Sequence, residues 1–246
     1  MVSSSFLIRS KRQLTSDAVY FVVDCAPLAQ AAQPGQFVQV GVPGFFLRRP
    51  ISVCTIDGST IGLVIAARGE GTGNLLQLEA GDTIDLLGPL GHGFEVADLQ
   101  APIALVGGGI GVPPLAALAK KMPQAQAFLG FQTRAQVMLE DAFSHAVVCT
   151  DDGSYGVHGL VTQPLEQALR QRKPSLICAC GPRPMLQAVA QLAEQYQVPC
   201  QVSLEERMAG GVGACLVCQC RLIRDGKEFS AHVCKDGPVF SAEEVF

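Results

Sequence analysis

Three cysteines near the C-terminus have the residue type and the spacing to bind iron. Cys215 and Cys218 are separated by two residues, and Cys234 follows after fifteen more. Plant-type [2Fe–2S] sites use the spacing C-x₄-C-x₂-C with a fourth, distant cysteine. Because such a cluster needs soft anionic ligands that converge on a small volume, Cys215, Cys218 and Cys234 are the candidate metal ligands.

The first cysteine of this spacing is absent. Counting back from Cys215 through the four-residue spacer leads to position 210, where the chain has Gly210. Together with Gly211 and Gly213, this residue suits a loop around a cluster, because glycine tolerates positive φ and lets backbone N–H groups approach sulfur. The sequence therefore predicts a cluster loop with three thiolates and one missing ligand.

Several groups could supply the fourth ligand. Cys220 is the nearest thiol, although in an extended strand its side chain would lie on the same face as Cys218. A water, a buried carboxylate or Cys200 are weaker options. A cluster completed by an exchangeable ligand would be incomplete or labile. The simpler alternative to a cluster site is a pair of small buried cysteines beside a flexible turn, with no metal bound.

Two further segments are suited to binding a phosphate. The first consists of Arg48, Arg49, Pro50, Ile51 and Ser52. A guanidinium can hold a pyrophosphate through two parallel charge-assisted hydrogen bonds, and proline fixes the chain so that Ser52 can face the same ligand. The second, around Gly71 and Thr72, is a glycine-rich loop that enters a short helix. Together they predict a bound dinucleotide; the alternative for the first segment is an exposed basic turn.

A second nucleotide site is predicted at two later loops. The first loop contains Gly107, Gly108, Gly109 and Gly111, and departs from G-x-G-x-x-G because Val112 replaces the third glycine. The second consists of Cys180, Gly181 and Pro182. Both follow predicted strands, and ligands of parallel sheets bind at the carboxyl ends of strands. Residues 129–134 lack the acidic residue typical of an NAD site, and Arg134 is the residue that could favour a 2′-phosphate.

The elements that would position these residues change along the chain. Residues 1–98 contain short β-rich runs at 19–23, 36–40, 61–66 and 83–87, separated by turns, as in a small barrel. Residues 99–203 alternate between predicted strands (103–106, 126–130, 146–150, 175–180) and helices (113–121, 162–172, 184–196). This order predicts a doubly wound parallel α/β sheet with helices on both faces. Residues 204–246 are expected to form a cysteine module.

Composition narrows the class of protein. The chain has 246 residues, a net charge of −4, no tryptophan and no run of basic residues, which argues against nucleic-acid binding. The uncharged stretch 99–119 is broken by prolines and glycines, so we expect no membrane span. The N-terminus of the chain lacks a signal-peptide pattern. We therefore expect a cytoplasmic protein whose ten cysteines are reduced or reserved for metal.

These segments carry a family resemblance. The whole chain resembles the ferredoxin reductase superfamily, through residues 49–52, the 107–114 loop and residues 180–182. Its C-terminal segments 205–208, 211–215 and 234–240 resemble the electron-transfer subunits of type B, NAD-dependent dihydroorotate dehydrogenase. The family shares its architecture with the small subunits of sulfide dehydrogenase and of NADH-dependent ferredoxin:NADP oxidoreductase.

The resemblance implies specific ligands and a partner. FAD would be bound by Arg49, Pro50, Ile51 and Ser52, by the strand Val64, Ile65 and Ala66, and by Gly71 and Thr72. A [2Fe–2S] cluster would be bound by Cys215, Cys218 and Cys234, and NAD(H) by the α/β half. The partner would be an FMN-containing catalytic subunit, assembled with this chain as an α2β2 heterotetramer.

The resemblance also implies a role in pyrimidine biosynthesis. Electrons would pass from dihydroorotate through FMN, the cluster and FAD to NAD⁺. Two alternatives stay open because of Gly210. The chain could be a cluster-deficient flavoprotein or docking subunit, or it could belong to a related NADH-dependent ferredoxin or sulfide oxidoreductase. The iron and acid-labile sulfide content per flavin distinguishes a cluster-bearing chain from a cluster-free one.

Overall fold

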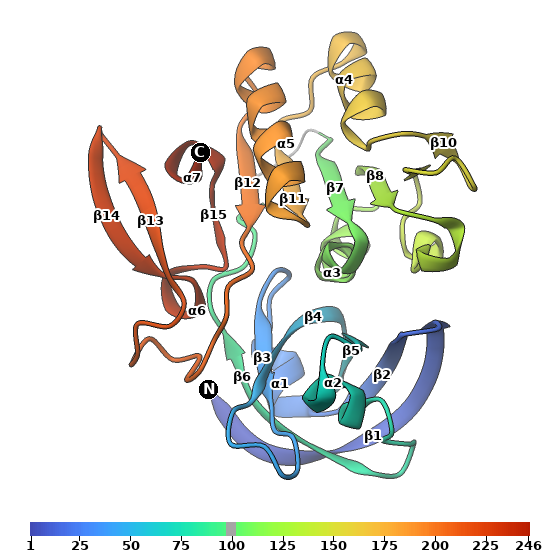
Figure 1. Cartoon of the computed structure of the whole chain (residues 1–246), viewed down its shortest axis with the longest axis vertical. Coiled ribbons are helices and arrows are strands. Elements are labelled where there is room, and N and C mark those ends of the chain that lie inside the picture. Colours follow the sequence, from blue (N-terminus) through green and yellow to red (C-terminus); the bar gives the residue numbers. More distant parts are fainter. Residues whose placement is uncertain (97–101) are drawn as a thin grey trace.

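The computed structural model describes residues 1–96 and 102–246 and contains a barrel, a seven-stranded sheet and a two-stranded hairpin (Figure 1). The expected boundary between residues 98 and 99 lies outside the described residues. None of the described helices combines the length and the apolar character that a membrane crossing requires.

The N-terminal half forms a closed antiparallel barrel in the order β1-β2-β5-β4-β3-β6. Its strands are β1 (Val2–Thr15), β2 (Ala18–Asp24), β3 (Phe37–Val40), β4 (Arg49–Asp57), β5 (Thr60–Ala66) and β6 (Thr83–Leu90). Two short helices, α1 (Ala26–Ala31) and α2 (Glu70–Leu75), complete it. Inward-facing aliphatic side chains such as Val38, Leu63 and Ile84 fill the barrel and are fully buried. Closure leaves this sheet without free edges.

A parallel sheet follows, in the order β10-β9-β8-β7-β11-β12, with the antiparallel β15 at one edge. Its strands are β7 (Ala104–Gly108), β8 (Gln126–Phe131), β9 (Ala146–Thr150), β10 (Val157–His158), β11 (Ile177–Cys180), β12 (Cys200–Ser203) and β15 (Val239–Ser241). The helices between strands are α3 (Pro113–Lys121), α4 (Thr162–Gln171) and α5 (Arg183–Tyr196), with short 3₁₀ turns at Gly109–Gly111, Arg134–Gln136 and Glu140–Ala142.

Helices cover both faces of this sheet. Leu115 and Leu118 of α3 belong to one hydrophobic core, whereas Leu165 of α4 and Leu186 of α5 belong to another. Helices α4 and α5 lie side by side on one face, and α3 lies between the sheet and the barrel (Figure 1). This arrangement confirms the predicted doubly wound α/β architecture that follows a β-barrel.

The barrel and the α/β unit share a core. Cys54 of β4 and Val64 of β5 pack with Leu115 and Leu118 of α3. The contact is reinforced at its rim by an ion pair of 3.3 Å between Lys120 and Asp57. Burying apolar surface between the two units, at roughly 25 cal/mol per Å², holds the loops of both units in a defined relative position.

The C-terminal residues form a hairpin, two short helices and the edge strand β15. The hairpin consists of β13 (Gln219–Arg224) and β14 (Lys227–His232); the helices are α6 (Val233–Asp236) and α7 (Ala242–Val245). Strand β15 pairs antiparallel with β12, with Ser203 opposite Val239. The segment that begins as a cysteine module thus ends as part of the α/β sheet.

Candidate functional site

Two of the segments predicted to bind a phosphate meet at the barrel. Arg49 begins β4, and its guanidinium lies against Gly71 in the first turn of α2: a Cβ atom at position 71 would stand 2.4 Å from the Arg49 Nη2 atom. The guanidinium donates a hydrogen bond of 2.6 Å to the Leu47 carbonyl and lies over the Phe45 ring at 5.1 Å. Arg49 is therefore held in place beside a glycine, an arrangement suited to clamping a pyrophosphate.

The neighbouring Arg48 is engaged elsewhere. Its Nη2 atom donates to the Asp85 carboxylate at 2.6 Å, and its Nη1 atom donates to the Gln39 carbonyl at 3.3 Å. Through these contacts the Arg48 guanidinium joins the segment before β4 to β3 and β6. The geometry thus favours Arg49 over Arg48 as the arginine that binds the phosphate.

The other residues expected at the flavin site lie on the neighbouring strands. Pro50, Ile51 and Ser52 continue β4 and pair with β3. Val64 and Ala66 face the core shared with α3, whereas Ile65 points into the barrel interior, so only the backbone of Ile65 could face a ligand outside the barrel. The Thr72 hydroxyl accepts hydrogen bonds from the backbone N–H groups of Arg68 and Gly69, at 2.8 and 3.2 Å, and orders the first turn of α2. Among these residues, Arg49 is the one whose cationic side chain could contact a phosphate.

The two glycine-containing loops of the α/β half are in contact with each other. A Cβ atom at Gly111 would lie 2.3 Å from the Cys180 carbonyl oxygen, and one at Gly108 would lie 2.9 Å from Pro182 Cδ. Gly107 of β7 lies opposite Cys180 of β11, because the two strands are paired there. Gly109 has φ +52° and no heavy atom of the described residues within 4 Å of its Cβ position. Its backbone is therefore open to a ligand at the carboxyl edge of the sheet.

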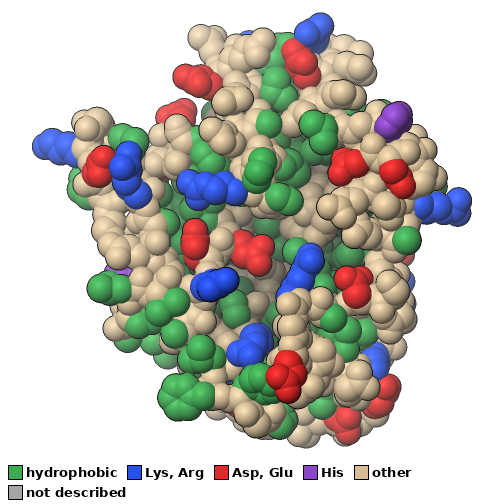
Figure 2. Space-filling model, in the orientation of Figure 1, with side chains coloured by type: hydrophobic (Ala, Val, Ile, Leu, Met, Phe, Trp, Pro, Cys, Tyr) green, Lys and Arg blue, Asp and Glu red, His purple; other side chains and the backbone are tan. Residues whose placement is uncertain are grey.

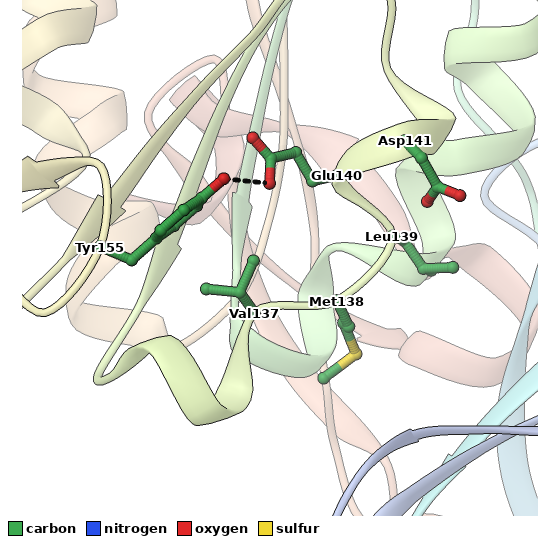
Figure 3. A pocket seen from close by; sticks show the side chains of 6 residues that line it. All are labelled: Val137, Met138, Leu139, Glu140, Asp141 and Tyr155. Atoms are coloured by element: carbon green, nitrogen blue, oxygen red, sulfur yellow. Dashed lines mark hydrogen bonds between the residues drawn. The ribbon is translucent and has the colours of Figure 1, made fainter.

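The carboxyl ends of β8 and β9 frame an open hollow of about 520 Å³ (Figure 3). The hollow is lined by Val137, Met138, Leu139, Glu140, Asp141 and Tyr155. Tyr155 donates a hydrogen bond of 2.9 Å to the Glu140 carboxylate, which raises the pKa of the Tyr155 hydroxyl. The Arg134 guanidinium lies over the Tyr155 ring at 5.5 Å. Tyr155 is thus contacted both by the Glu140 carboxylate, which no sequence motif singles out, and by the Arg134 guanidinium.

The cysteine loop surrounds Cys215 with backbone donors. Hydrogen bonds from the N–H groups of Val217, Gly210 and Ala209 lower the pKa of the Cys215 thiol, the bond from Val217 having the largest effect. Such donors stabilise a thiolate, which is the form that binds iron.

The other two cysteines of the loop lie together. The Cys218 and Cys234 side chains share a hydrogen bond, and Gly213 N–H donates to Cys234 Sγ at 3.2 Å. Burial and the neighbouring Cys218 raise the pKa of Cys234 to about 11.

These residues fit a sulfur-ligated cluster except at one corner. Within residues 1–96 and 102–246, no three His, Cys, Asp or Glu side chains are already close enough to hold a metal ion. At Gly210, however, a Cβ atom would lie 3.9 Å from Cys215 Sγ. The loop therefore holds three thiols, and a glycine stands where the spacing predicts a fourth ligand.

The two thiols considered as replacement ligands are placed differently. Cys200 lies on β12, paired with Ile177 of β11, and its thiol neighbours Cys178 inside the α/β sheet; Cys200 is therefore removed from the cysteine loop. Cys220 lies on β13 beside Cys218 and Glu206, and burial raises its pKa. The structure rules against Cys200 and leaves Cys220 near the site.

The tip of the cysteine loop carries exposed apolar side chains. Val212, Leu216 and Val217 are 42%, 70% and 54% exposed, and Phe46 in the loop between β3 and β4 is fully exposed. Hydrophobic side chains gather at the lower left of the face shown in Figure 2, over the cysteine loop and the barrel loops beside it. Lys and Arg side chains lie around the middle of the same face, between the barrel and the α/β unit.

Comparisons with known proteins agree with this arrangement. Residues 205–246 match the family model of the iron–sulfur cluster binding domain of dihydroorotate dehydrogenase B. The electron transfer subunit of dihydroorotate dehydrogenase B (NAD(+)) from Geobacillus kaustophilus is 44% identical, with 100% of this chain and 99% of the relative aligned. Its counterpart from Caldanaerobacter subterraneus subsp. tengcongensis is 41% identical over 86% of each chain. A solved structure of the NADH-dependent reduced ferredoxin-NADP oxidoreductase matches with a TM-score of 0.86 and 30% identity, covering 98% of this chain and 89% of that one.

Proposed function

The chain belongs to the family of electron transfer subunits of dihydroorotate dehydrogenase B. We propose that it accepts electrons from a catalytic partner, which oxidises dihydroorotate, and passes them to NAD⁺. Its cofactors are FAD, a [2Fe–2S] cluster and NAD(H). The cluster supplies one-electron transfer, and a flavin can exchange both single electrons and a hydride. The observation that carries the proposal is the joining of a barrel, a parallel α/β sheet and a cysteine loop through shared cores.

Each unit then has its own task. Arg49 beside Gly71 would hold the FAD pyrophosphate, and the paired loops at Gly108 and Gly181 would hold the nicotinamide nucleotide at the carboxyl edge of the sheet. Cys215, Cys218 and Cys234 would hold the cluster, and the backbone N–H groups around Cys215 would favour its thiolate. Hydride exchange and one-electron transfer would thus occupy different parts of the chain.

The partner we propose is an FMN-containing catalytic subunit, assembled with this chain as a heterotetramer in the cytoplasm, where the pair serves pyrimidine biosynthesis. The exposed apolar tip around Leu216 supports this assignment, because it adjoins the candidate cluster ligands. An apolar surface next to a redox centre lets a partner exclude water and approach closely.

We expect Leu216→Asp to weaken coupling to that partner at least tenfold, because a charge would be buried in an apolar interface. Dihydroorotate-dependent NAD⁺ reduction by the reconstituted complex measures the coupling, and NADH-dependent dye reduction by the same preparation measures the flavin half, which should be unchanged. Phe229→Asp is the matched control, since Phe229 is 46% exposed but lies on the hairpin. Equal losses in the two variants, or an unchanged complex with Leu216→Asp, would argue against docking at this tip.

The proposed nucleotide is NAD(H) rather than NADP(H). Glu140 and Asp141 line the hollow together with Tyr155, over whose ring Arg134 lies, and their carboxylates would repel a 2′-phosphate there. We therefore expect a kcat/KM at least tenfold higher for NADH than for NADPH in steady-state dye reduction. Glu140→Gln should narrow that ratio, whereas Glu166→Gln, on α4 and paired with Arg170, should leave it unchanged. Comparable kcat/KM values for the two nucleotides in the unmodified chain would contradict the preference.

A further inference from the structure

Gln39 is a buried glutamine for which neither the barrel nor the cysteine loop provides a hydrogen-bond partner. Gln39 is 0% exposed. Among residues 1–96 and 102–246, its Oε1 and Nε2 atoms are the only buried side-chain polar atoms that lack a hydrogen-bond partner. Buried amides are nearly always hydrogen-bonded, because an unpartnered one forfeits its interactions with water. An orphaned amide of this kind indicates that a group absent from the protein chain belongs beside it.

The alternation of β3 directs Gln39 toward the cysteine loop. Val38 and Val40 point into the barrel core, so Phe37 and Gln39 point outward. On that outer face Phe37 packs in the same cluster as Cys218 and Cys234. Gln39 is thus the polar member of a barrel face that the cysteine loop covers.

The amide of Gln39 lies at the residue next to the missing ligand. A Cβ atom at Gly211 would stand 2.6 Å from Gln39 Nε2, so the carboxamide contacts the Gly211 backbone directly. Gly211 has φ +82°, a conformation that also favours glycine. The preceding residue is Gly210, where a Cβ atom would lie 3.9 Å from Cys215 Sγ. A glutamine side chain therefore borders the one corner of the loop that has no thiol.

We propose that the Gln39 carboxamide oxygen takes the place of the missing thiolate at the corner of the iron–sulfur site that Gly210 leaves open; this inference rests on the cluster proposed above. Oxygen is a harder ligand than sulfur and binds iron less strongly than a thiolate does. The site is accordingly one of three thiolates and one neutral oxygen donor. Gln39 also gains the partner that the chain alone does not give it.

Four proteins prepared anaerobically test the assignment: the unmodified chain, Gln39→Leu, Gly210→Cys and the double variant. We expect Gln39→Leu to lower iron and acid-labile sulfide per FAD at least threefold in the unmodified chain and to have no effect in the Gly210→Cys background. A thiolate at position 210 makes the oxygen ligand unnecessary, so the two substitutions should be strongly non-additive. Gln39→Glu should retain iron and shift the electron paramagnetic resonance signal of the reduced cluster, since a carboxylate is also an oxygen ligand.

Phe37→Leu controls for packing, because Phe37 lies on the same face of the same strand but offers no ligand atom. It should change iron content equally in both backgrounds, and FAD content together with the melting temperature will show whether each variant is folded. A loss of iron on Gln39→Leu that is the same in both backgrounds would assign Gln39 to packing alone and overturn the proposal. So would an iron-loaded unmodified chain that Gln39→Leu leaves unchanged. Absence of iron from all four proteins would instead refute the proposed cluster itself.

Discussion

Gly210→Cys is expected to convert a labile, sub-stoichiometric iron site into a stable [2Fe–2S] cluster with a full complement of iron and sulfide. The backbone at Gly210 is not in the left-handed region, so cysteine can replace glycine without strain. Among the described residues, Cys215 Sγ, at 3.9 Å, is the only heavy atom within 4 Å of the Cβ position. A fourth thiolate then completes the ligand set that this spacing normally supplies.

Gly211→Cys is the matched control for that substitution. It adds a thiol one residue away, but at φ +82° and with a Cβ atom 2.6 Å from Gln39 Nε2. We expect it to give no stable cluster and to destabilise the protein. Iron, sulfide and the visible spectrum should be measured during exposure to air, together with coupling to the partner; NADH-driven FAD reduction should be similar in all forms. An iron content that Gly210→Cys does not change would show that position 210 is not a ligand position.

The second large effect is expected at the flavin. Arg49→Ala should weaken FAD binding by about 1.5–3 kcal/mol, the scale of a lost charged hydrogen-bond partner, which corresponds to roughly a ten- to hundredfold higher Kd. The Kd of Arg49→Lys for FAD should fall between those of the unmodified chain and Arg49→Ala, because lysine keeps the charge but cannot form two parallel hydrogen bonds. Flavin fluorescence on dilution gives the Kd directly.

Arg48→Ala serves as the control for Arg49→Ala. Arg48 is paired with Asp85 and with the Gln39 carbonyl, so its removal should cost about 0–1 kcal/mol of folding stability and leave FAD bound. The opposite pattern, with FAD retained by Arg49→Ala and lost by Arg48→Ala, would reverse the assignment of the two arginines.

Local patterns were sufficient to predict the three helices and four strands of the α/β half, whereas the short strands β10 and β12 were not predicted. Helix Pro113–Lys121 and strand Ala146–Thr150 have the predicted bounds, because a proline start and a compact β-branched run are strong local signals. The strand Val2–Thr15 carries no such signal: most of its residues are polar and exposed, and its pairing with β2 and β6 is what makes it a strand. The hairpin β13–β14 could have been predicted from its Asp225-Gly226 turn, in which both residues have positive φ.

Some residues of the candidate sites can be predicted from local sequence, whereas others are brought to the sites only by the fold. Spacing alone predicts Cys215, Cys218 and Cys234 as ligands, since a metal loop is compact in sequence. The family resemblance already favours Arg49 over Arg48, and the contact of Arg48 with Asp85, in another strand, supports that choice. Gln39 carries no motif at all, and only closure of the barrel and the fold of the loop bring it to Gly211. Contacts between distant parts of the chain, rather than local patterns, thus determine these roles.

The short strand β15 links the cysteine module to the solubility of the protein. It begins five residues after Cys234 and covers the edge of β12, whose backbone groups would otherwise be unpaired. Exposed strand edges recruit other chains and promote aggregation. Unfolding of the cysteine module would therefore also expose the β12 edge of the α/β sheet.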